Sequence, residues 1–406
     1  MCDEESNIKE VTDAEENNTL SLLDLPVEIL LHICSYLDAS TLVHNLGLVC
    51  KYLNQILNDD SLWRARISQI WPNVGFPVLP PDKEDELFYK LSCVSIERQM
   101  ALWKKPDALE KLTLIGKHYG TIDGLLLMHN GTICISGGRD RSLVCWNLPA
   151  DENEQCTSTG VETAHTGWIW GLTSIENTIY SCGWDGTVNA WALCPSGLSR
   201  LKTYDMAVPR AVLCISSCPE TSTFAAGSAS NTVFVFDPRS CEPVAKFRPH
   251  HNAILKLAMN AKFILTASED KTVSVWDQRA RRTLTSITMS NRSFPMSISM
   301  HREIVHVGDS SGNLHILDPK NDFTNVKCYM GEHLKGINGV HYTPGCLITV
   351  SLDRTVKISS PTDPPLNLNT LNCHYGEIAS SAYMNEVLAV AAADVIEIWR
   401  PKMQFR

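Results

Sequence analysis

The sequence predicts an all-β seven-bladed propeller, preceded by a small all-α domain of three helices and a helical linker. Three observations support this fold class. An aspartate and a tryptophan recur six residues apart, short strand-like segments surround each recurrence, and residues 20–68 have the apolar period of helices. We therefore expect a disordered acidic tail over residues 1–19, the helical domain over 20–68, the linker over 69–108 and the propeller over 109–401.

Composition and charge narrow the classes of partner and location. The chain has 406 residues, a net charge of −10 and a pI near 5.7, which argues against nucleic acid or a membrane as its partner. Its 15 cysteines form no CxxC pair, and its first residues lack the features of a signal peptide. The longest apolar run, Val387 to Trp399, is too short to span a bilayer. We therefore expect a soluble intracellular protein, cytoplasmic or nuclear or both, with reduced cysteines.

The spacing of aspartate and tryptophan defines seven units. Aligning the chain on this pair gives steps of 40 to 45 residues. The aligned aspartate positions are Asp140, Asp185, Ser230, Asp270, Ser311, Asp353 and Ala393, and the aligned tryptophan positions are Trp146, Trp191, Phe236, Trp276, Leu317, Ser359 and Trp399. Segments such as FILTAS and TVSVWD have the composition of strands. This period is typical of four-stranded propeller blades.

These units resemble WD40 repeats. In that family a His before the blade, a Ser or Thr on the second strand, an Asp in the tight turn and a Trp on the third strand form a buried hydrogen-bonded chain. The Ser or Thr here stands four residues before the Asp each time, and the indole N–H can then reach its hydroxyl. The resemblance implies three such sets, which are His118, Ser136, Asp140 and Trp146; His165, Ser181, Asp185 and Trp191; and His251, Thr266, Asp270 and Trp276.

The same residue types raise the alternative of a hydrolase, because His, Ser and Asp form a catalytic trio in many hydrolases. Three copies of one trio, each tied to a tryptophan at fixed spacing, favour a structural role instead. We therefore expect no catalytic residue, no metal and no cofactor. The third, fifth and seventh units lack the aligned aspartate, and we expect them to be held mainly by apolar packing.

The propeller also has to close. The sequence ends soon after the third strand of the last unit, whereas EKLTLIG, residues Glu110–Gly116, has strand character and precedes the first unit. We expect this segment to supply the outer strand of the last blade and so to remove two sheet edges.

The helical segment resembles an F-box, a three-helix module that docks on the adaptor Skp1. The pairs Leu25-Pro26, Tyr36-Leu37, Val49-Cys50 and Leu62-Trp63 stand where that motif places them. A generic amphipathic helical hairpin, which could share some of these apolar positions, is the alternative. The resemblance implies a Skp1-binding surface formed by Leu25, Pro26, Ile29, Leu30 and Ile33.

The segment Asp82 to Lys105, between the two modules, predicts a helix. Leu87, Leu91 and Val94 would line one side, with Met100 and Trp103 near its end. A plain linker is the alternative. A stiff helix would instead fix the distance between the modules.

An F-box followed by WD40 repeats resembles the F-box/WD-repeat proteins, and HICSYLDA, GRDRSLVCW, TGWIWGL, PTDPP and EIWR add to that resemblance. It implies a non-catalytic substrate receptor of an SCF (Skp1–cullin–F-box) ubiquitin ligase. The F-box would hold Skp1, and through it cullin and RING subunits, while the propeller would hold an unidentified protein substrate. The alternative is an assembly scaffold that binds Skp1 without delivering substrates.

The WD40 resemblance also places a substrate surface around the central channel. Residues three and five positions after the blade His, and the one before the turn Asp, tend to face the top of the disc. In the second unit these are Trp168, Trp170 and Trp184, although some could pack only between blades. Nearby basic residues would be Arg139, Arg210 and Lys256. Two arginines are few for a phosphate reader, so we expect an aromatic contact that does not strictly require phosphorylation.

Overall fold

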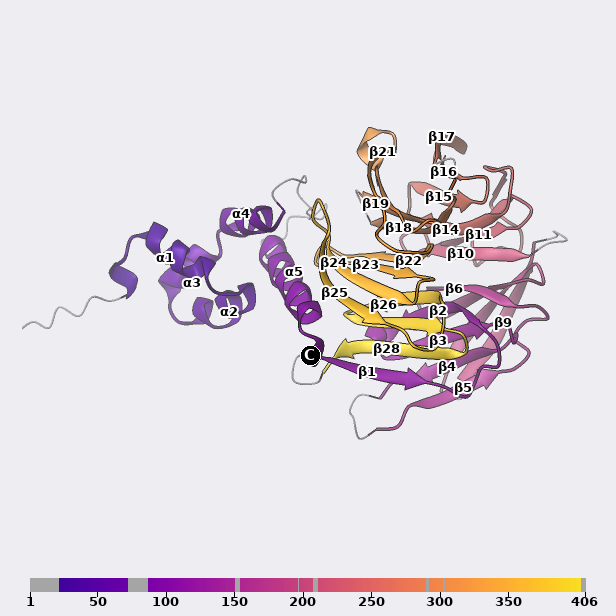
Figure 1. The fold of residues 1–406 in the computed structure, drawn as a ribbon, viewed down its shortest axis with the longest axis horizontal. Coiled ribbons are helices and arrows are strands. Elements are labelled where there is room, and N and C mark those ends of the chain that lie inside the picture. The colour runs from indigo at the N-terminus through magenta and orange to yellow at the C-terminus, as the bar shows by residue number, and fades with distance from the viewer. Residues whose placement is uncertain are drawn as a thin grey trace, which may run out of the picture.

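The computed structural model describes residues 22–71, 87–149, 154–195, 197–206, 211–289, 292–301 and 304–402. The predicted acidic tail over residues 1–19 and the candidate site residue Arg210 lie outside the described residues. Figure 1 shows a group of helices beside a ring of β-sheets.

The ring is a seven-bladed propeller, which confirms the predicted fold. Each blade is a four-stranded antiparallel sheet. The first three blades consist of β2 (Ile122–Met128), β3 (Ile133–Gly138), β4 (Leu143–Asn147) and β5 (Thr157–Val161); β6 (Ile169–Ile175), β7 (Thr178–Gly183), β8 (Thr187–Cys194) and β9 (Gly197–Asp205); and β10 (Val212–Cys218), β11 (Thr223–Ser228), β12 (Val233–Phe236) and β13 (Ala245–Phe247).

The remaining blades follow the same order. They consist of β14 (Ile254–Met259), β15 (Phe263–Ser268), β16 (Thr272–Asp277) and β17 (Arg282–Thr288); β18 (Pro295–His301), β19 (Ile304–Asp309), β20 (Leu314–Asp318) and β21 (Thr324–Tyr329); β22 (Ile337–Tyr342), β23 (Leu347–Ser351), β24 (Thr355–Ser360) and β25 (Leu366–Asn372); and β26 (Ile378–Met384), β27 (Val387–Ala392), β28 (Val395–Pro401) and β1 (Leu109–Leu114).

The first described strand closes the propeller, as the sequence predicts. β1 pairs antiparallel with β28, and the register runs from Leu109 opposite Pro401 to Leu114 opposite Ile396. Ion pairs between Glu110 and Arg400 and between Lys111 and Glu397 cross this seam. The seventh blade therefore joins the two ends of the propeller and leaves no free edge between first and last blades.

The helical domain resolves into α1 (Val27–Ser35), α2 (Ala39–His44), α3 (Lys51–Leu57) and α4 (Asp60–Ile70). The second of the three expected helices is divided into α2 and α3 by a 3-10 turn at Leu46–Leu48. Asn45 and Gly47, which are weak helix formers, stand at this division.

The linker helix is α5 (Phe88–Lys104), and it is part of both domains. Its residues Cys93 and Ile96 pack with Leu42 and Trp63 of the helical domain. Near its end, Trp103 packs in the propeller core among residues of β23, β24, β27 and β28. The alternative of a plain linker is therefore wrong.

The sequence places Leu87, Leu91 and Val94 along one side of this helix, but the fully buried residues are others. Leu87 and Leu91 are exposed, whereas Tyr89, Cys93 and Ile96 are buried. Trp71, which directly follows α4, also packs on the propeller, against Leu314 and neighbouring apolar residues. The helices are thus fixed to the sheets at more than one point.

No helix in the described part of the chain combines the length and the apolar character that crossing a bilayer requires.

Candidate functional site

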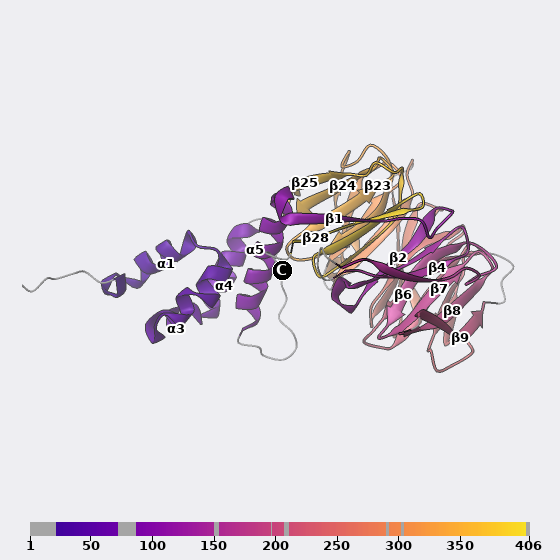
Figure 2. The same ribbon diagram turned by 90° about the horizontal axis from the view of Figure 1, so that it is seen from below.

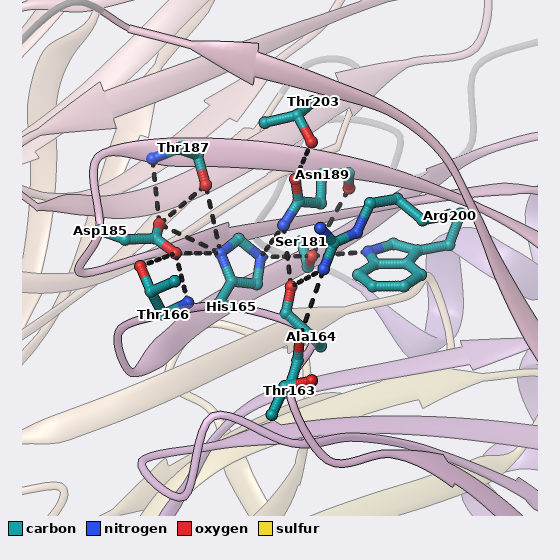
Figure 3. Close-up of polar contacts among 11 residues, drawn as sticks. Thr163, Ala164, His165, Thr166, Ser181, Asp185, Thr187, Asn189, Arg200 and Thr203 are labelled. Atoms are coloured by element: carbon teal, nitrogen blue, oxygen red, sulfur yellow. Dashed lines mark hydrogen bonds and ion pairs between the residues drawn. The ribbon is translucent and has the colours of Figure 1, made fainter.

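The predicted hydrogen-bonded chain of the second blade is present (Figure 3). The His165 ring bonds through Nδ1 to Asp185 at 3.0 Å and through Nε2 to the Ser181 hydroxyl at 2.7 Å. The indole nitrogen of Trp191 donates to the same hydroxyl at 2.8 Å. The first blade repeats the arrangement with His118, Ser136, Asp140 and Trp146. These sets connect a loop, a turn and two strands of one sheet.

The turn aspartates are held as carboxylates. Burial by itself raises the pKa of Asp185, but the hydrogen bond and charge of His165 and the bonds from Thr187 and Thr166 outweigh burial, so the pKa lies well below its usual value. The pKa of Asp140 is lowered in the same way by its bonds to His118 and Ser142, against burial. The ionised form is therefore the one that stabilises each turn.

The predicted histidine of the third set is wrong by one residue. The ring that contacts Asp270 at 3.0 Å and Thr266 at 2.8 Å belongs to His250. His251 is exposed, and only its backbone N–H reaches Asp270. In the described structure Trp276 is not part of this hydrogen-bonded set. Its ring instead stacks on Phe247, with centroids 3.8 Å apart.

Two further polar networks were missed. In the sixth blade, His333 bonds to Asp353 at 3.0 Å and to the Thr349 hydroxyl at 2.9 Å. In the fifth blade, the buried Asp309 accepts hydrogen bonds from Ser293 and Asn313 and contacts His315. The expectation that the fifth blade is held mainly by apolar packing is therefore incomplete. The sequence pattern did not identify the network of the sixth blade because that unit lacks the tryptophan. It did not identify the network of the fifth blade because Asp309 precedes the aligned Ser311 by two residues.

These trios cannot act on a substrate in this arrangement. Ser136 and Ser181 are fully buried, and each hydroxyl oxygen accepts an indole N–H. A nucleophile needs access to the reacting atom, which is absent here. Within the described ranges, no group of three or more His, Cys, Asp or Glu side chains is arranged to hold a metal ion.

The first helix of the helical domain presents apolar side chains to solvent. Ile29 is 46% exposed and Ile33 38% exposed, and Pro26 lies exposed at the residue before α1. Leu25 is half-buried. Leu30 is only 3% exposed and belongs to the interior of the domain, so it cannot itself touch a partner in this conformation. The exposed apolar side chains of this helix form a candidate docking surface.

The three predicted tryptophans of the second blade lie together. The ring centroids of Trp168 and Trp184 are 5.5 Å apart, and Trp170 lies 6.3 Å from Trp168 and 6.0 Å from Trp184. Trp168 and Trp184 are 42% and 53% exposed, while Trp170 is half-buried. The alternative of packing only between blades thus applies at most to Trp170. We call these three residues the tryptophan cluster.

Arg139 belongs to the same surface. Its guanidinium lies 5.3 Å from the ring centre of Trp168 and 5.2 Å from that of Trp170. It also donates to Asp123 at 2.8 Å. The charge of Arg139 is therefore already engaged by a carboxylate and two aromatic rings.

Lys256 lies in the central channel. It was predicted by counting from His251, and counting from the correct histidine, His250, moves the predicted positions by one residue. Counting from His250 gives Ala253 and Leu255, and Lys256 is one residue further along β14. A cavity of about 180 Å³, lined by the innermost strand of each of the seven blades, contains both Lys256 and Trp170 in its wall.

The tryptophan cluster and the helical domain lie at opposite faces of the disc. In the sixth blade, β23 connects a turn containing Thr343, which contacts α5, to a turn containing Asp353. Trp184 directly precedes Asp185, and the turn that contains Asp185 in the second blade is equivalent to the turn that contains Asp353 in the sixth. Figures 1 and 2 show α5 at one end of the blades, between the ring and the other helices.

The face that carries the cluster has other exposed apolar side chains that the sequence interpretation missed. Tyr119 and Leu334 are 91% and 93% exposed, and each backbone N–H donates to the turn aspartate of its blade. Both directly follow a blade histidine, and that position could have identified them.

Comparison with known proteins agrees with this architecture. The F-box-like family matches residues 22–68, and the WD domain, G-beta repeat family matches residues 155–192, 200–237 and 241–277. The chain is 31% identical to F-box/WD repeat-containing protein 9 of Bos taurus and 30% identical to that of Homo sapiens, over 93% of this chain and 82% of each relative. It is 29% identical to F-box/WD repeat-containing protein mec-15 of Caenorhabditis elegans, over 74% of this chain and 75% of that protein.

A solved structure supports the fold alone. The WD40 beta propeller domain of Doa1 superposes with a TM-score of 0.63 at 18% identity, covering 72% of this chain and 97% of that one.

Proposed function

The chain belongs to the family of F-box/WD repeat-containing proteins, and from this premise we propose that it is a substrate receptor of an SCF ubiquitin ligase. In this role the helical domain binds Skp1, and through it cullin and RING subunits, and the propeller binds the protein to be ubiquitinated. The observation that carries the proposal is the placement of two exposed apolar surfaces, on α1 and on the tryptophan cluster, at opposite sides of one connected structure.

The surface of α1 supports the first half of the proposal. Pro26, Ile29 and Ile33 are exposed on a helix that already buries Leu30 and Cys34 in its own domain. An apolar surface that remains after the core is filled is typical of a docking site. Leu30 would support the surface from beneath, and Leu25 would contribute at its margin.

The tryptophan cluster supports the second half. Trp168 and Trp184 offer large exposed rings, and Arg139 lies over the rings of Trp168 and Trp170. Exposed aromatic residues are the usual anchors of protein interfaces. Because the described basic residues near the cluster are Arg139 and Lys256, and Arg139 is already paired, binding does not strictly require a phosphorylated partner.

The helices would hold the Skp1-binding surface at a fixed distance from the substrate-binding surface. Arg66 of α4 and Glu97 of α5 are 2.5 Å apart, Arg66 also donates to the Leu37 carbonyl, and Glu97 accepts from the Ala39 N–H at 2.7 Å. The junction between α1 and α2 is therefore bonded to the helix that enters the propeller. A rigid connection keeps a bound substrate at a set distance from the ligase and raises its effective concentration there. The chain itself performs no bond chemistry.

The alternative is a scaffold that binds Skp1 without delivering substrates. Immunoprecipitation with the proteasome blocked separates the two functions. A receptor brings down Skp1 together with cullin and RING subunits and with proteins that carry ubiquitin. Recovery of Skp1 without cullin and RING would support the scaffold.

A further inference from the structure

The cavity in the central channel has a chemical character that defines what the tryptophan cluster can bind. The inference rests on the proposed function of the cluster as a substrate contact. The cavity wall contains Asp123, Trp170, Lys256 and His341, each from a different blade. Its volume of about 180 Å³ is enough for an inserted side chain but not for a folded element.

Two hydrogen-bond donors of this wall have no acceptor. The indole nitrogen of Trp170 is buried and without a hydrogen-bond partner in the described structure. The ammonium group of Lys256 forms neither an ion pair nor a hydrogen bond with any described residue, and its charge contributes to the lowered pKa of the buried His341. A buried indole N–H without an acceptor is costly and an unpaired ammonium attracts anions, so an acceptor that enters the cavity would be bound favourably.

The fixed charges of the wall favour an anion. The carboxylate in the wall, Asp123, is engaged by Arg139, which donates to it at 2.8 Å. His341 adds no charge of its own, because burial and the charge of Lys256 lower its pKa to about 4 and keep the ring neutral. Lys256 is therefore the uncompensated charge of the described wall, and it is positive.

The geometry points to a carboxylate side chain of the bound protein, and we propose that the substrate segment contains an acidic residue next to an apolar one. The apolar residue packs on Trp168 and Trp184, and the Asp or Glu enters the cavity to accept from Trp170 and pair with Lys256. One ammonium and one indole N–H match a singly charged carboxylate. A phosphate group, with twice the charge and three oxygens, would leave acceptors unpaired here.

Selection of short random peptides displayed on phage, with the full chain bound to Skp1 as the target, tests this proposal. Binders that are lost on a Trp168→Ala/Trp184→Ala variant are kept and sequenced. We expect these peptides to share an Asp or Glu beside an apolar residue. Replacing that Asp by Asn, or Glu by Gln, should weaken binding about tenfold or more.

Substitution of the lysine provides the matching half of the test. Lys256→Met should weaken the acidic peptides about tenfold, should leave their Asn or Gln versions unchanged, and should not alter Skp1 binding. Lys262→Met, at an exposed lysine of the turn after β14, is the control and should have no effect. Lys256→Glu should select peptides with Lys or Arg instead.

The outcomes separate this proposal from the function it rests on. Cluster-dependent peptides without an acidic residue, or acidic peptides that bind Lys256→Met as well as the parent chain, would overturn the carboxylate site and leave the cluster as a contact. Competition by phosphoserine or by inorganic phosphate would also overturn it. If no peptide depended on the cluster, both the carboxylate site and the substrate surface would be rejected, while the Skp1 surface would stand.

Discussion

The Thr343 hydroxyl donates to the side-chain oxygen of Gln99 at 2.7 Å, and this bond attaches α5 to the turn between β22 and β23. An ion pair between Arg98 and Glu386, 3.2 Å apart, forms beside it. Both contacts lie at the face of the propeller opposite the tryptophan cluster. The helical domain is therefore held on the disc by side chains, in addition to the chain connection through β1.

The contact of α5 with the propeller predicts the effect of a small substitution. A Cβ atom added at Gly345 would lie 2.8 Å from the Gln99 Cβ. Gly345→Ala should therefore displace α5 and lower the free energy of unfolding by about 1–3 kcal/mol, because no space is available. Gly160→Ala is the control, since its Cβ would meet Val144 at an ordinary 3.5 Å. Denaturant unfolding of both variants measures the difference, and equal stabilities would contradict tight docking of the helix.

The hydrogen bonds within the second blade predict a structural role for Asp185. Its removal leaves the His165 ring and the N–H groups of Thr166 and Thr187 without their acceptor. Asp185→Ala should therefore cost about 1–3 kcal/mol or more, measurable as a lower Tm. Glu220→Ala, at an exposed carboxylate, should change stability little. If Asp185→Ala abolished a chemical activity without any loss of thermal stability, the role of Asp185 would be catalytic rather than structural.

The two blade tryptophans that were expected to be equivalent should differ. Trp191 is 1% exposed and donates to Ser181, so Trp191→Ala should cost about 3–5 kcal/mol through the cavity it leaves. Trp276 is partly exposed and stacks on Phe247, so Trp276→Ala should cost less. Parallel thermal unfolding compares them. A larger loss at Trp276 would mean that it does belong to a buried hydrogen-bonded chain.

Stability should fall in mild acid because of buried histidines. Burial, together with the charge of His301, lowers the pKa of His306 from 6.5 to about 3. Between these values the unfolded chain binds a proton that the folded chain does not, so the free energy of unfolding decreases as pH falls below 6.5. The same direction holds for His341, His250 and His333, whose pKa values are also lowered by burial.

A single variant checks this assignment. His306→Phe keeps an aromatic ring against Tyr342, whose ring centroid lies 4.8 Å away, and removes the titrating group. The variant should lose less stability than the parent between pH 6.5 and pH 4, in denaturant titrations at each pH. His44→Phe, at an exposed histidine, should leave the slope unchanged. An unaltered slope in His306→Phe would show that other groups cause the acid sensitivity.

The sequence predicted the fold well because the propeller repeats one spacing seven times. The interval of six positions from the aspartate to the tryptophan defined the blades even where Ser230 or Ala393 replaces the aspartate. The closing strand was predicted to within two residues at its C-terminal end, since β1 ends at Leu114 rather than Gly116. A periodic pattern constrains every unit at once, and chance matches are then rare.

The errors have different causes. His250 stands 20 residues before Asp270, as His165 stands before Asp185, whereas His251 stands 19 before it, so the spacing could have identified His250. Leu30 was assigned to the outer surface because a 3.6-residue period does not say which of two neighbouring apolar residues faces the core. The cavity at Lys256 depends on side chains from all seven blades, and only the closed ring brings them together.

Comparing lysine ubiquitination across three forms of the chain in cells, with the proteasome blocked, tests the central claim most directly. The three forms are the parent, an α1 variant with Ile29→Ala/Ile33→Ala, and a propeller variant with Trp168→Ala/Trp184→Ala. The control is Leu91→Ala, at an exposed leucine of α5. We predict that the α1 variant still captures the parent's partners but no longer binds Skp1, so that these partners are no longer ubiquitinated. The propeller variant should keep Skp1, cullin and RING subunits and lose the partners. Retention of Skp1 by the first variant, or of every partner by the second, would contradict the account.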